Sequence, residues 1–245
     1  HLHAVGGLSA CAAGDLDAAR RLVHESGWAA AHAVDKHGST SLMWAASFGR
    51  LEVARWLVRE QAAEVDATNK AGRTALMFAC KYGKLDVCRF LLSDEAGADA
   101  ALRMRDDSSA FDWAVFGGHI PTMELLAQHP QVDVHGTNRW GCAAVQWAAA
   151  AGNVATCRWL MRKGVDLGVI NDAQHGAVGK AAWQGHIPCL EFLVLAPEGP
   201  KLGAQLLLKD KDGRSVAELA RMNGQDAAAE WLEKRMEWSL TDQWH

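Results

Sequence analysis

Small apolar residues and glycines recur along the chain at a fixed spacing. The pattern Ala-x-x-x-Gly is found at Ala10/Gly14, Ala45/Gly49, Ala79/Gly83, Ala114/Gly118, Ala148/Gly152, Ala181/Gly185 and Ala220/Gly224. Successive alanines of this pattern stand 35, 34, 35, 34, 33 and 39 positions apart. A period this constant indicates a stack of repeats, each contacting its neighbours, in place of one central core.

A second apolar run follows each glycine of the pattern. In two repeats it extends from Leu51 to Leu57 and from Leu85 to Leu91, and its apolar residues fall on one face of a helix. Each repeat is therefore predicted to be a short helix, a Gly that ends it in the left-handed conformation, and a second amphipathic helix. Pro121 and Pro188 begin two of these second helices, where a missing N–H does no harm.

Bulky aromatic residues occupy one shared position before the small residues. We expect them to fill the layer between repeats, next to alanines that let the helices approach closely. With other tryptophans at recurring helical positions, the residues assigned to the core are Trp44, Trp56, Phe78, Trp113, Trp147, Trp159 and Trp231. The longest interval contains extra Pro and Gly between Ala196 and Lys201, so an exposed loop is predicted there.

These residues resemble the ankyrin repeat family, whose pattern runs D-x-x-G-x-T-P-L-H-x-A-A-x-x-G-H-x-E-V-V-x-L-L. The best matches run from Asp35 to Leu57 and from Asn69 to Leu91, with weaker matches from Asn138 to Leu160 and from Asp210 to Leu232. The resemblance covers nearly the whole chain and implies an all-α ankyrin-repeat solenoid of about seven helix-turn-helix repeats joined by hairpin loops. We place the repeats of this single domain, 1-245, at approximately 1-34, 35-68, 69-103, 104-137, 138-170, 171-209 and 210-245.

The sequence departs from the family pattern in its loops. No repeat keeps the Pro or the His of the T-P-L-H tetrad, and in the family that His helps to join adjacent repeats by hydrogen bonds. Asp107 and Gln174 also replace the loop Gly, although a positive φ is unfavourable without Gly. We therefore expect irregular loops in the fourth and sixth repeats.

Composition favours a folded chain without an obvious polyanionic partner. Hydrophobic residues make up 49% and charged residues 22% of the chain, and 25 Lys and Arg against 29 Asp and Glu give a formal charge of -4. We expect no specific nucleic acid as a partner. The 18 uncharged residues from Trp140 to Cys157 are mainly alanine, too weakly apolar to favour lipid, so no membrane insertion is expected.

The cysteines and the missing glycosylation signal favour a reducing compartment. The six cysteines include no C-x-x-C pair, the chain has no Asn-x-Ser/Thr sequon, and no charged region precedes an apolar run at the N-terminus. We expect an intracellular protein, cytoplasmic or nuclear, with buried thiols. Because the chain begins at His1, we also expect that it is a fragment or a trimmed form of a longer protein.

Motifs of enzymes and metal sites are missing from the sequence. There is no P-loop, H-E-x-x-H, G-x-S-x-G or dinucleotide fingerprint. The calcium-like start at Asp210 has Arg221 where the twelfth loop position needs an acidic residue, and the histidines are scattered. We therefore predict a protein that is not an enzyme, with no catalytic residue, no cofactor and no metal.

The resemblance implies that partners bind to the loop tips and to the exposed side of each first helix. Carried over position by position, the candidate partner-binding residues are Lys36, His37, Phe48, Lys70, Arg73, Lys81, Tyr82, Arg105, Phe116, Arg139, Trp140 and Trp183. Of the 25 positions on this surface in repeats two to six, six are basic and two acidic, the opposite balance to the whole chain. Aromatic anchors bordered by cations suit an acidic peptide segment with apolar side chains.

Other interpretations of the same residues stay open. The aromatic side chains of this surface can simply cover neighbouring helices while its charges are solvated. We predict a monomeric scaffold or adaptor for protein–protein interaction. The alternative is a regulatory or targeting ankyrin segment of a larger enzyme or channel, and nucleic-acid binding has only the basic strip in its favour.

Overall fold

The computed structural model describes residues 2–241, whose regular elements are all helices. The chain divides into two compact units, His1–Asp133 (unit 1) and Val134–His245 (unit 2). The helices of unit 1 are α1 (Leu2–Ala13), α2 (Leu16–Ser26), α3 (Ser41–Phe48), α4 (Leu51–Arg59), α5 (Ala75–Lys81), α6 (Leu85–Leu91), α7 (Ala110–Gly117) and α8 (Ile120–Ala127).

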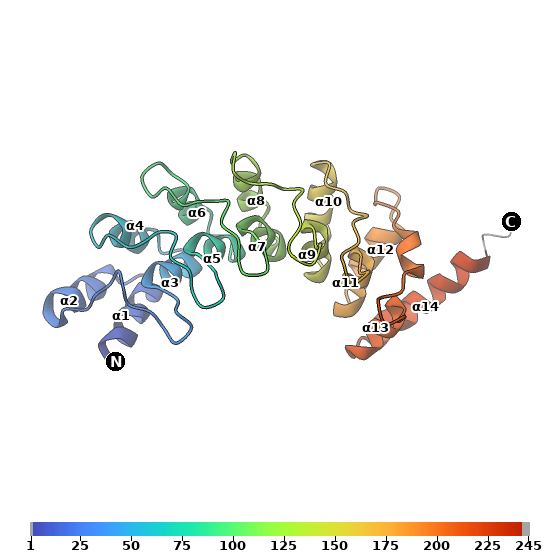
Figure 1. The fold of residues 1–245 in the computed structure, drawn as a ribbon, viewed down its shortest axis with the longest axis horizontal. Helices are drawn as coiled ribbons and strands as arrows, with labels where there is room; N and C mark the ends of the chain where they lie inside the picture. The colour runs from blue at the N-terminus through green and yellow to red at the C-terminus, as the bar shows by residue number, and fades with distance from the viewer. Residues whose placement is uncertain (1, 242–245) are drawn as a thin grey trace. The chain divides into compact units, whose positions relative to one another are not determined.

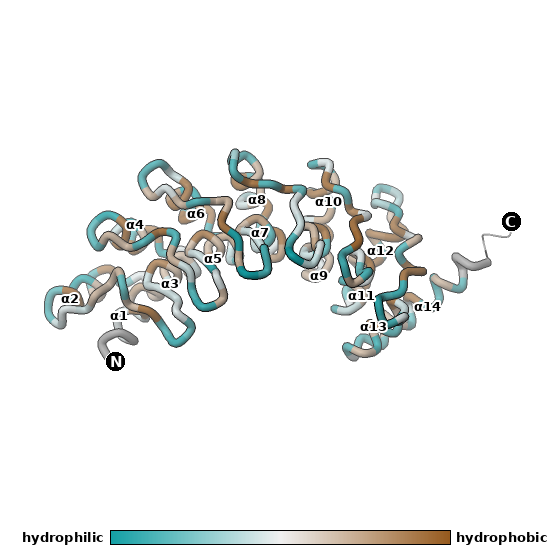
Figure 2. The backbone as a smooth tube through the Cα atoms, viewed as in Figure 1, coloured by the Kyte–Doolittle hydropathy of each residue, from teal (hydrophilic) through white to brown (hydrophobic). Residues whose placement is uncertain are grey.

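Unit 1 is a stack of antiparallel helix pairs, one pair to a repeat. The first helices α1, α3, α5 and α7 pack side by side in that order, and the second helices α4, α6 and α8 form a parallel row (Figure 1). The hairpin loops that join the pairs are the hydrophilic segments of Figure 2, whereas the first helices are largely apolar. The predicted all-α repeat architecture is confirmed.

Unit 2 has the same construction. Its elements are α9 (Ala144–Ala150), α10 (Val154–Arg162), α11 (Ala177–Gln184), α12 (Ile187–Val194), the 3₁₀ helix η1 (Gly203–Leu207), α13 (Val216–Met222) and α14 (Asp226–Thr241). Helix α11 packs between α9 and α13, α10 packs on α12, and η1 lies against α11 and α14. In the long interval after α12, Pro197, Glu198 and Lys201 are exposed, which agrees with the expected loop.

Local sequence explains where the helices begin and end. At α3 the hydroxyl of Thr40 accepts a hydrogen bond of 3.2 Å from the N–H of Met43, which satisfies one of the free donors of the first turn. Gly49 ends the helix with φ 71° and donates its N–H back to Ala45 and Ala46. Both alanines are fully buried, so α3 can approach its neighbours closely.

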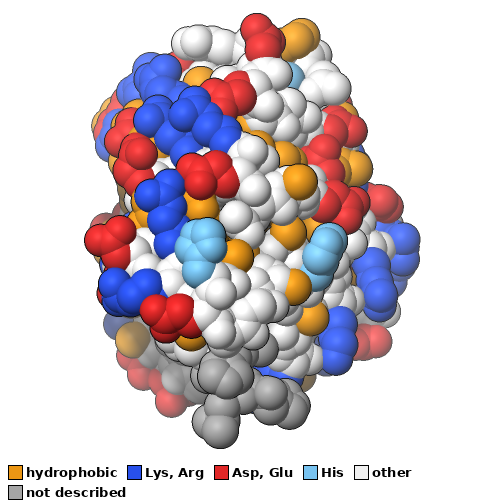
Figure 3. Space-filling view, turned by 90° about the vertical axis from the view of Figure 1, so that its left-hand side faces the viewer, with side chains coloured by type: hydrophobic (Ala, Val, Ile, Leu, Met, Phe, Trp, Pro, Cys, Tyr) orange, Lys and Arg blue, Asp and Glu red, His pale blue; other side chains and the backbone are white. Residues whose placement is uncertain are grey.

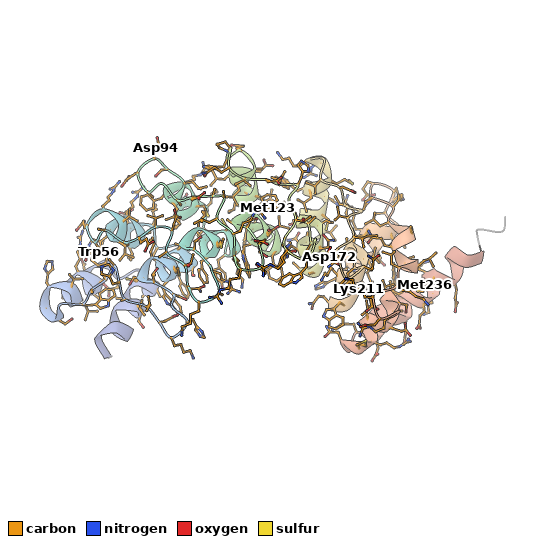
Figure 4. All side chains as sticks on the ribbon, viewed as in Figure 1. Trp56, Asp94, Met123, Asp172, Lys211 and Met236 are labelled. Atoms are coloured by element: carbon orange, nitrogen blue, oxygen red, sulfur yellow. The ribbon has the colours of Figure 1, made fainter. Side chains whose placement is uncertain are left out.

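The core of unit 1 lies between its two rows of helices. Trp56 of α4 and Met123 of α8, both labelled in Figure 4, are 3% and 0% exposed. All six cysteines of the chain are buried and free, so Cys88 and Cys157 are core residues as the sequence suggested. No helix among residues 2–241 is long and apolar enough to cross a membrane.

The core assignment of the tryptophans is only partly correct. Trp56 and Trp159 are buried, as predicted. The other aromatic residues assigned to the core are only half-buried, namely Trp44, Phe78, Trp113, Trp147 and Trp231. In the first helices, four apolar residues such as Leu42, Met43 and the two alanines already fill the layer between repeats, so the bulky aromatic side chain is left at the edge of that layer.

The expectation of irregular loops in repeats four and six is wrong. Asp107 and Gln174 adopt φ of 61° and 65°, close to the 77° of Gly38. Their N–H groups donate to the carbonyls of Met104 and Asn171, just as the Gly38 N–H donates to Asp35. The cost of a positive φ is small at Asp107, whose short polar side chain tolerates the left-handed region, and at Gln174 the same hydrogen bonding of the loop imposes the common geometry.

Candidate functional site

The first helices of unit 1 carry an apolar groove on the surface beside the hairpin loops. Its volume is about 350 Å³. We call it the aromatic groove, and its lining residues are Ser39, Met43, Trp44, Ser47, Phe48, Phe78, Tyr82 and Lys84. A hollow of this size, with a few polar groups among aromatic side chains, is typical of a binding site.

Helix geometry creates the walls of the groove. Trp44 and Phe48 stand four residues apart on α3, one turn from each other, and their rings stack with centroids 6.1 Å apart and planes 7° from parallel. Phe78 and Tyr82 repeat this spacing on α5 and at its C-cap. Phe48 and Tyr82 remain 49% and 44% exposed, so the groove is open to a partner.

Two cations converge on one tryptophan beside this groove. The guanidinium carbon of Arg73 lies 4.6 Å from the centre of the Trp113 ring, and the Lys81 Nζ lies 4.8 Å from it. The same Lys81 Nζ is 5.4 Å from the centre of the Tyr82 ring. We call Arg73 and Lys81 the cation pair. Tyr82 therefore belongs both to the groove and to the surroundings of the cation pair.

Packing holds Trp113 in place under the cations. Its indole N–H donates to the Sδ of Met104 over 3.0 Å, and its ring meets Phe116 edge to face with centroids 6.1 Å apart. Arg73 comes from the hairpin loop before α5, Lys81 ends α5, and Trp113 belongs to α7. The arrangement thus joins two neighbouring repeats.

The cation pair carries positive charge that the described residues do not neutralise. Partial burial lowers the pKa of Lys81, and the nearby charge of Arg73 lowers it further. The Arg73 Nε is shielded from solvent and has no hydrogen-bond acceptor. In contrast, Arg20 and Arg59 of the same unit form ion pairs with Glu60 and Glu95.

The loop tips of unit 1 present further cations. Lys70 Nζ donates to the carbonyl of Lys36 over 2.8 Å, and the Lys70 N–H donates to the carbonyl of His37 over 3.0 Å. Adjacent loops are therefore linked through their backbones while Lys36, His37 and Arg105 stay exposed. These positions suit a charged rim around the groove.

The candidate residues taken from the sequence fall into both units. Nine of them lie in unit 1, where the structure brings Phe48 and Tyr82 together in the groove and Arg73, Lys81 and Phe116 around Trp113. The three in unit 2 are Arg139, Trp140 and Trp183. Trp140 is 52% exposed at a loop tip and Trp183 is 36% exposed on α11.

Sequence reasoning missed part of the groove. The periodic pattern assigns Trp44, Phe78 and Trp113 to the core, but they form the walls of the groove or support the cation pair. The four-residue spacing from Trp44 to Phe48, and from Phe78 to Tyr82, is the signal that could have found them, because it places both rings on one helical face.

Other chemistry is not apparent in the described part of the chain. Among residues 2–241, no group of three or more His, Cys, Asp or Glu is placed to hold a metal ion. Charges of both signs are interspersed at the α1 and α2 end of unit 1, which Figure 3 shows face on.

The comparisons with known proteins agree with this architecture. A family model described as ankyrin repeats in three copies matches residues 8–104, 61–138 and 111–210. A similar solved structure is that of the predatory endopeptidase Bd0816 from Bdellovibrio bacteriovorus in complex with the immunity protein Bd3460. The matched chain of that structure is 26% identical with a TM-score of 0.61, and the match covers 76% of this chain and 95% of that one. This protein belongs to the ankyrin repeat family.

Proposed function

We propose that this protein is a non-catalytic scaffold or adaptor that holds an extended segment of a partner protein on the first-helix side of unit 1. The observation that carries the proposal is the aromatic groove with the cation pair at its side. Ankyrin repeats generally bind proteins, and the similar solved structure is itself a complex with an immunity protein. Apolar anchors in the groove would supply most of the affinity.

Charge supports an acidic partner for this surface. The cation pair lies beside the groove, and the hairpin loops of the same unit carry the exposed cations Lys36, Lys70 and Arg105. An acidic segment would be steered to this side, and its carboxylates would offset charges that no described residue neutralises. The proposed location is cytoplasmic or nuclear, supported by six free buried thiols, which are typical of a reducing compartment.

A comparative pull-down tests the proposal. The intact chain, a Phe48→Ala/Tyr82→Ala variant and an Arg89→Ala control would be used as bait in extract from the source cells. Arg89 is exposed on α6 and does not line the groove. We expect proteins retained by the parent and the control to be lost with the double variant. Equal recovery with all three baits, each folded by circular dichroism, would refute binding at the groove.

A further inference from the structure

The two charges of the cation pair share one aromatic ring, and neither forms an ion pair with a described carboxylate. Arg20, Arg55 and Arg59 each form an ion pair with a glutamate. Arg73 and Lys81 form none with a described carboxylate, the charge of Arg73 disfavours that of Lys81, and the shielded Arg73 Nε has no hydrogen-bond acceptor. Two like charges held close together without a counterion are unfavourable on their own, and a bound anion would remove that cost.

The two cations are already held in place for such an anion. Both lie over the Trp113 ring, at 4.6 Å and 4.8 Å, and the indole N–H is fixed by Met104. A guanidinium offers planar donors, and an ammonium adds a compact charge with three donors of its own. Because packing on the ring already restricts these long side chains, less conformational entropy is lost when they bind.

The lining of the aromatic groove determines which peptide side chain can bind next to the anion. Lys84 is among its lining residues, so a cationic side chain would be repelled, whereas Trp44 and Phe78 favour an apolar one. Tyr82 lines the groove and lies 5.4 Å from the Lys81 Nζ. The two subsites are thus adjacent, and residues close together in one peptide can occupy both.

The charge count favours a phosphate over a single carboxylate. A phosphorylated serine or threonine carries about −1.5 to −2 charges near pH 7 and three acceptor oxygens, which match an arginine and a lysine together. One carboxylate would leave about one positive charge without a partner. We propose that Arg73 and Lys81 bind the phosphate of a phosphorylated serine or threonine in a partner peptide, with an apolar side chain of that peptide in the aromatic groove. This inference rests on the proposed function and specifies the chemistry of its partner.

Synthetic peptides test the inference on the intact chain. In acetyl-Gly-Phe-Gly-X-Gly amide, X is phosphoserine, aspartate or serine, and two further sets place X one or three residues after Phe. Binding is measured by calorimetry at pH 7.5. For the best spacing we expect the phosphoserine peptide to bind at least about tenfold more tightly than the aspartate peptide. At pH 5.5 the phosphate is largely a monoanion because its second pKa is about 6, so that advantage should shrink.

Matched variants locate the effect. Arg73→Gln and Lys81→Gln should each abolish most of the preference for phosphoserine, whereas Arg89→Gln on α6 should keep it. The Trp113 indole N–H signal of the parent chain, assigned with Trp113→Phe, should move on adding the phosphoserine peptide. This second measurement uses the parent chain, so it does not depend on whether the Gln variants fold. The Trp183 signal, from unit 2, should stay in place.

The outcomes separate this inference from the proposed function. Equal affinity for the aspartate and phosphoserine peptides would overturn the phosphate subsite and leave the acidic-partner proposal intact. A phosphoserine preference that survives both Gln variants, or that leaves the Trp113 signal unmoved, would also overturn it. If no peptide binds while the pull-down still depends on Phe48 and Tyr82, the inference fails and the proposed function stands.

Discussion

Single residues differ in what they contribute according to which row of helices carries them. Trp56, on a second helix, is 3% exposed in the core, whereas Trp147, on a first helix, is half-buried. The same residue type therefore stabilises the fold in one row and remains accessible at the surface in the other. A large side chain gains most from burial when all its faces are covered.

Truncating these two tryptophans should separate the two roles. We expect Trp56→Ala to lower the free energy of unfolding by about 3–5 kcal/mol, as for a large aromatic residue deleted from a core. Trp147→Ala should cost less, about 1–2 kcal/mol, since part of its surface is already in contact with water. Denaturant titration of both variants measures the difference. Equal losses would mean that Trp147 is buried as deeply as Trp56.

A histidine between two loops of unit 2 should make stability depend on pH. His175 Nε2 lies 3.9 Å from Asp210 Oδ2, and burial, followed by the charge of Lys180, lowers the pKa of His175 from its ordinary value of 6.5 despite that carboxylate. The unfolded chain then binds more protons than the folded one just below pH 6.5. Stability is present in full above this pH and is lost as the pH falls through the folded pKa.

The parent chain should therefore lose more stability between about pH 7.5 and pH 5 than His175→Gln does. The difference should be below about 1 kcal/mol because the imidazole is partly exposed and solvent screens its interactions. Denaturant midpoints at both pH values, measured in parallel, isolate this histidine from other groups. A larger pH effect in the variant than in the parent would contradict the sign.

At the scale of elements, two histidines that follow helix-ending glycines each tie their repeat to the one before it. His119 Nε2 lies 3.1 Å from the carbonyl of Lys81, and His186 Nε2 lies 3.1 Å from that of Ala150. The ring of His119 sits directly over Gly83, where an added Cβ would lie 2.4 Å from Nδ1. Gly83 is therefore needed both for its φ of 62° and for the space beside it.

Two glycines of unit 1 provide a matched comparison. Gly27 has φ 64°, and an added Cβ there would meet nothing within 4 Å, so Gly27→Ala should cost only the backbone strain, about 1 kcal/mol. Gly83→Ala should cost clearly more, about 2–4 kcal/mol, because it also displaces His119. Chemical denaturation of the two variants checks the order. A smaller loss for Gly83→Ala would show that the His119 contact contributes little.

Much of this element-level structure could be predicted from the sequence. The Ala-x-x-x-Gly period locates the helix pairs, because small residues and a left-handed Gly are direct requirements of close packing and helix ending. The position of Trp44 could not be predicted, since a bulky apolar residue is equally compatible with a core position and with the wall of a surface groove. The prediction at Asp107 is wrong because its own φ preference is weaker than the common hydrogen bonding of the loops.

The candidate site was predictable only in parts. Exposed positions such as Lys70 and Tyr82 follow from the repeat register. The convergence of Arg73 and Lys81 on Trp113 depends on side-chain directions from two repeats, which periodicity does not specify. This convergence is the observation from which we propose a phosphate group, where the sequence alone suggested only an acidic partner.

Over the whole chain, resistance to proteolysis should follow the repeat pattern. Limited proteolysis with trypsin is expected to cut near Lys201, which is exposed in the interval between α12 and η1, before any site in residues 69–92. Cleavage needs a segment that opens locally, and that interval has fewer buried residues than α5 and α6. Mass spectrometry of early fragments identifies the first cut. Prior cleavage at Lys70 or Lys84 would contradict this ranking.

Long-range charge and short-range packing should affect partner binding in different ways. Lys70 is exposed at a loop tip, so Lys70→Glu should mainly slow association with a partner identified by pull-down, and added salt should reduce the difference from the parent. Tyr82 lines the groove, so Tyr82→Ala should mainly speed dissociation, at a cost of about 1–3 kcal/mol that depends little on salt. Surface plasmon resonance at two ionic strengths separates the rate constants. If Lys70→Glu instead changed only the dissociation rate, its charge would be in direct contact with the partner and not part of a steering rim. If both variants bound normally, the partner would lie on another face of the protein.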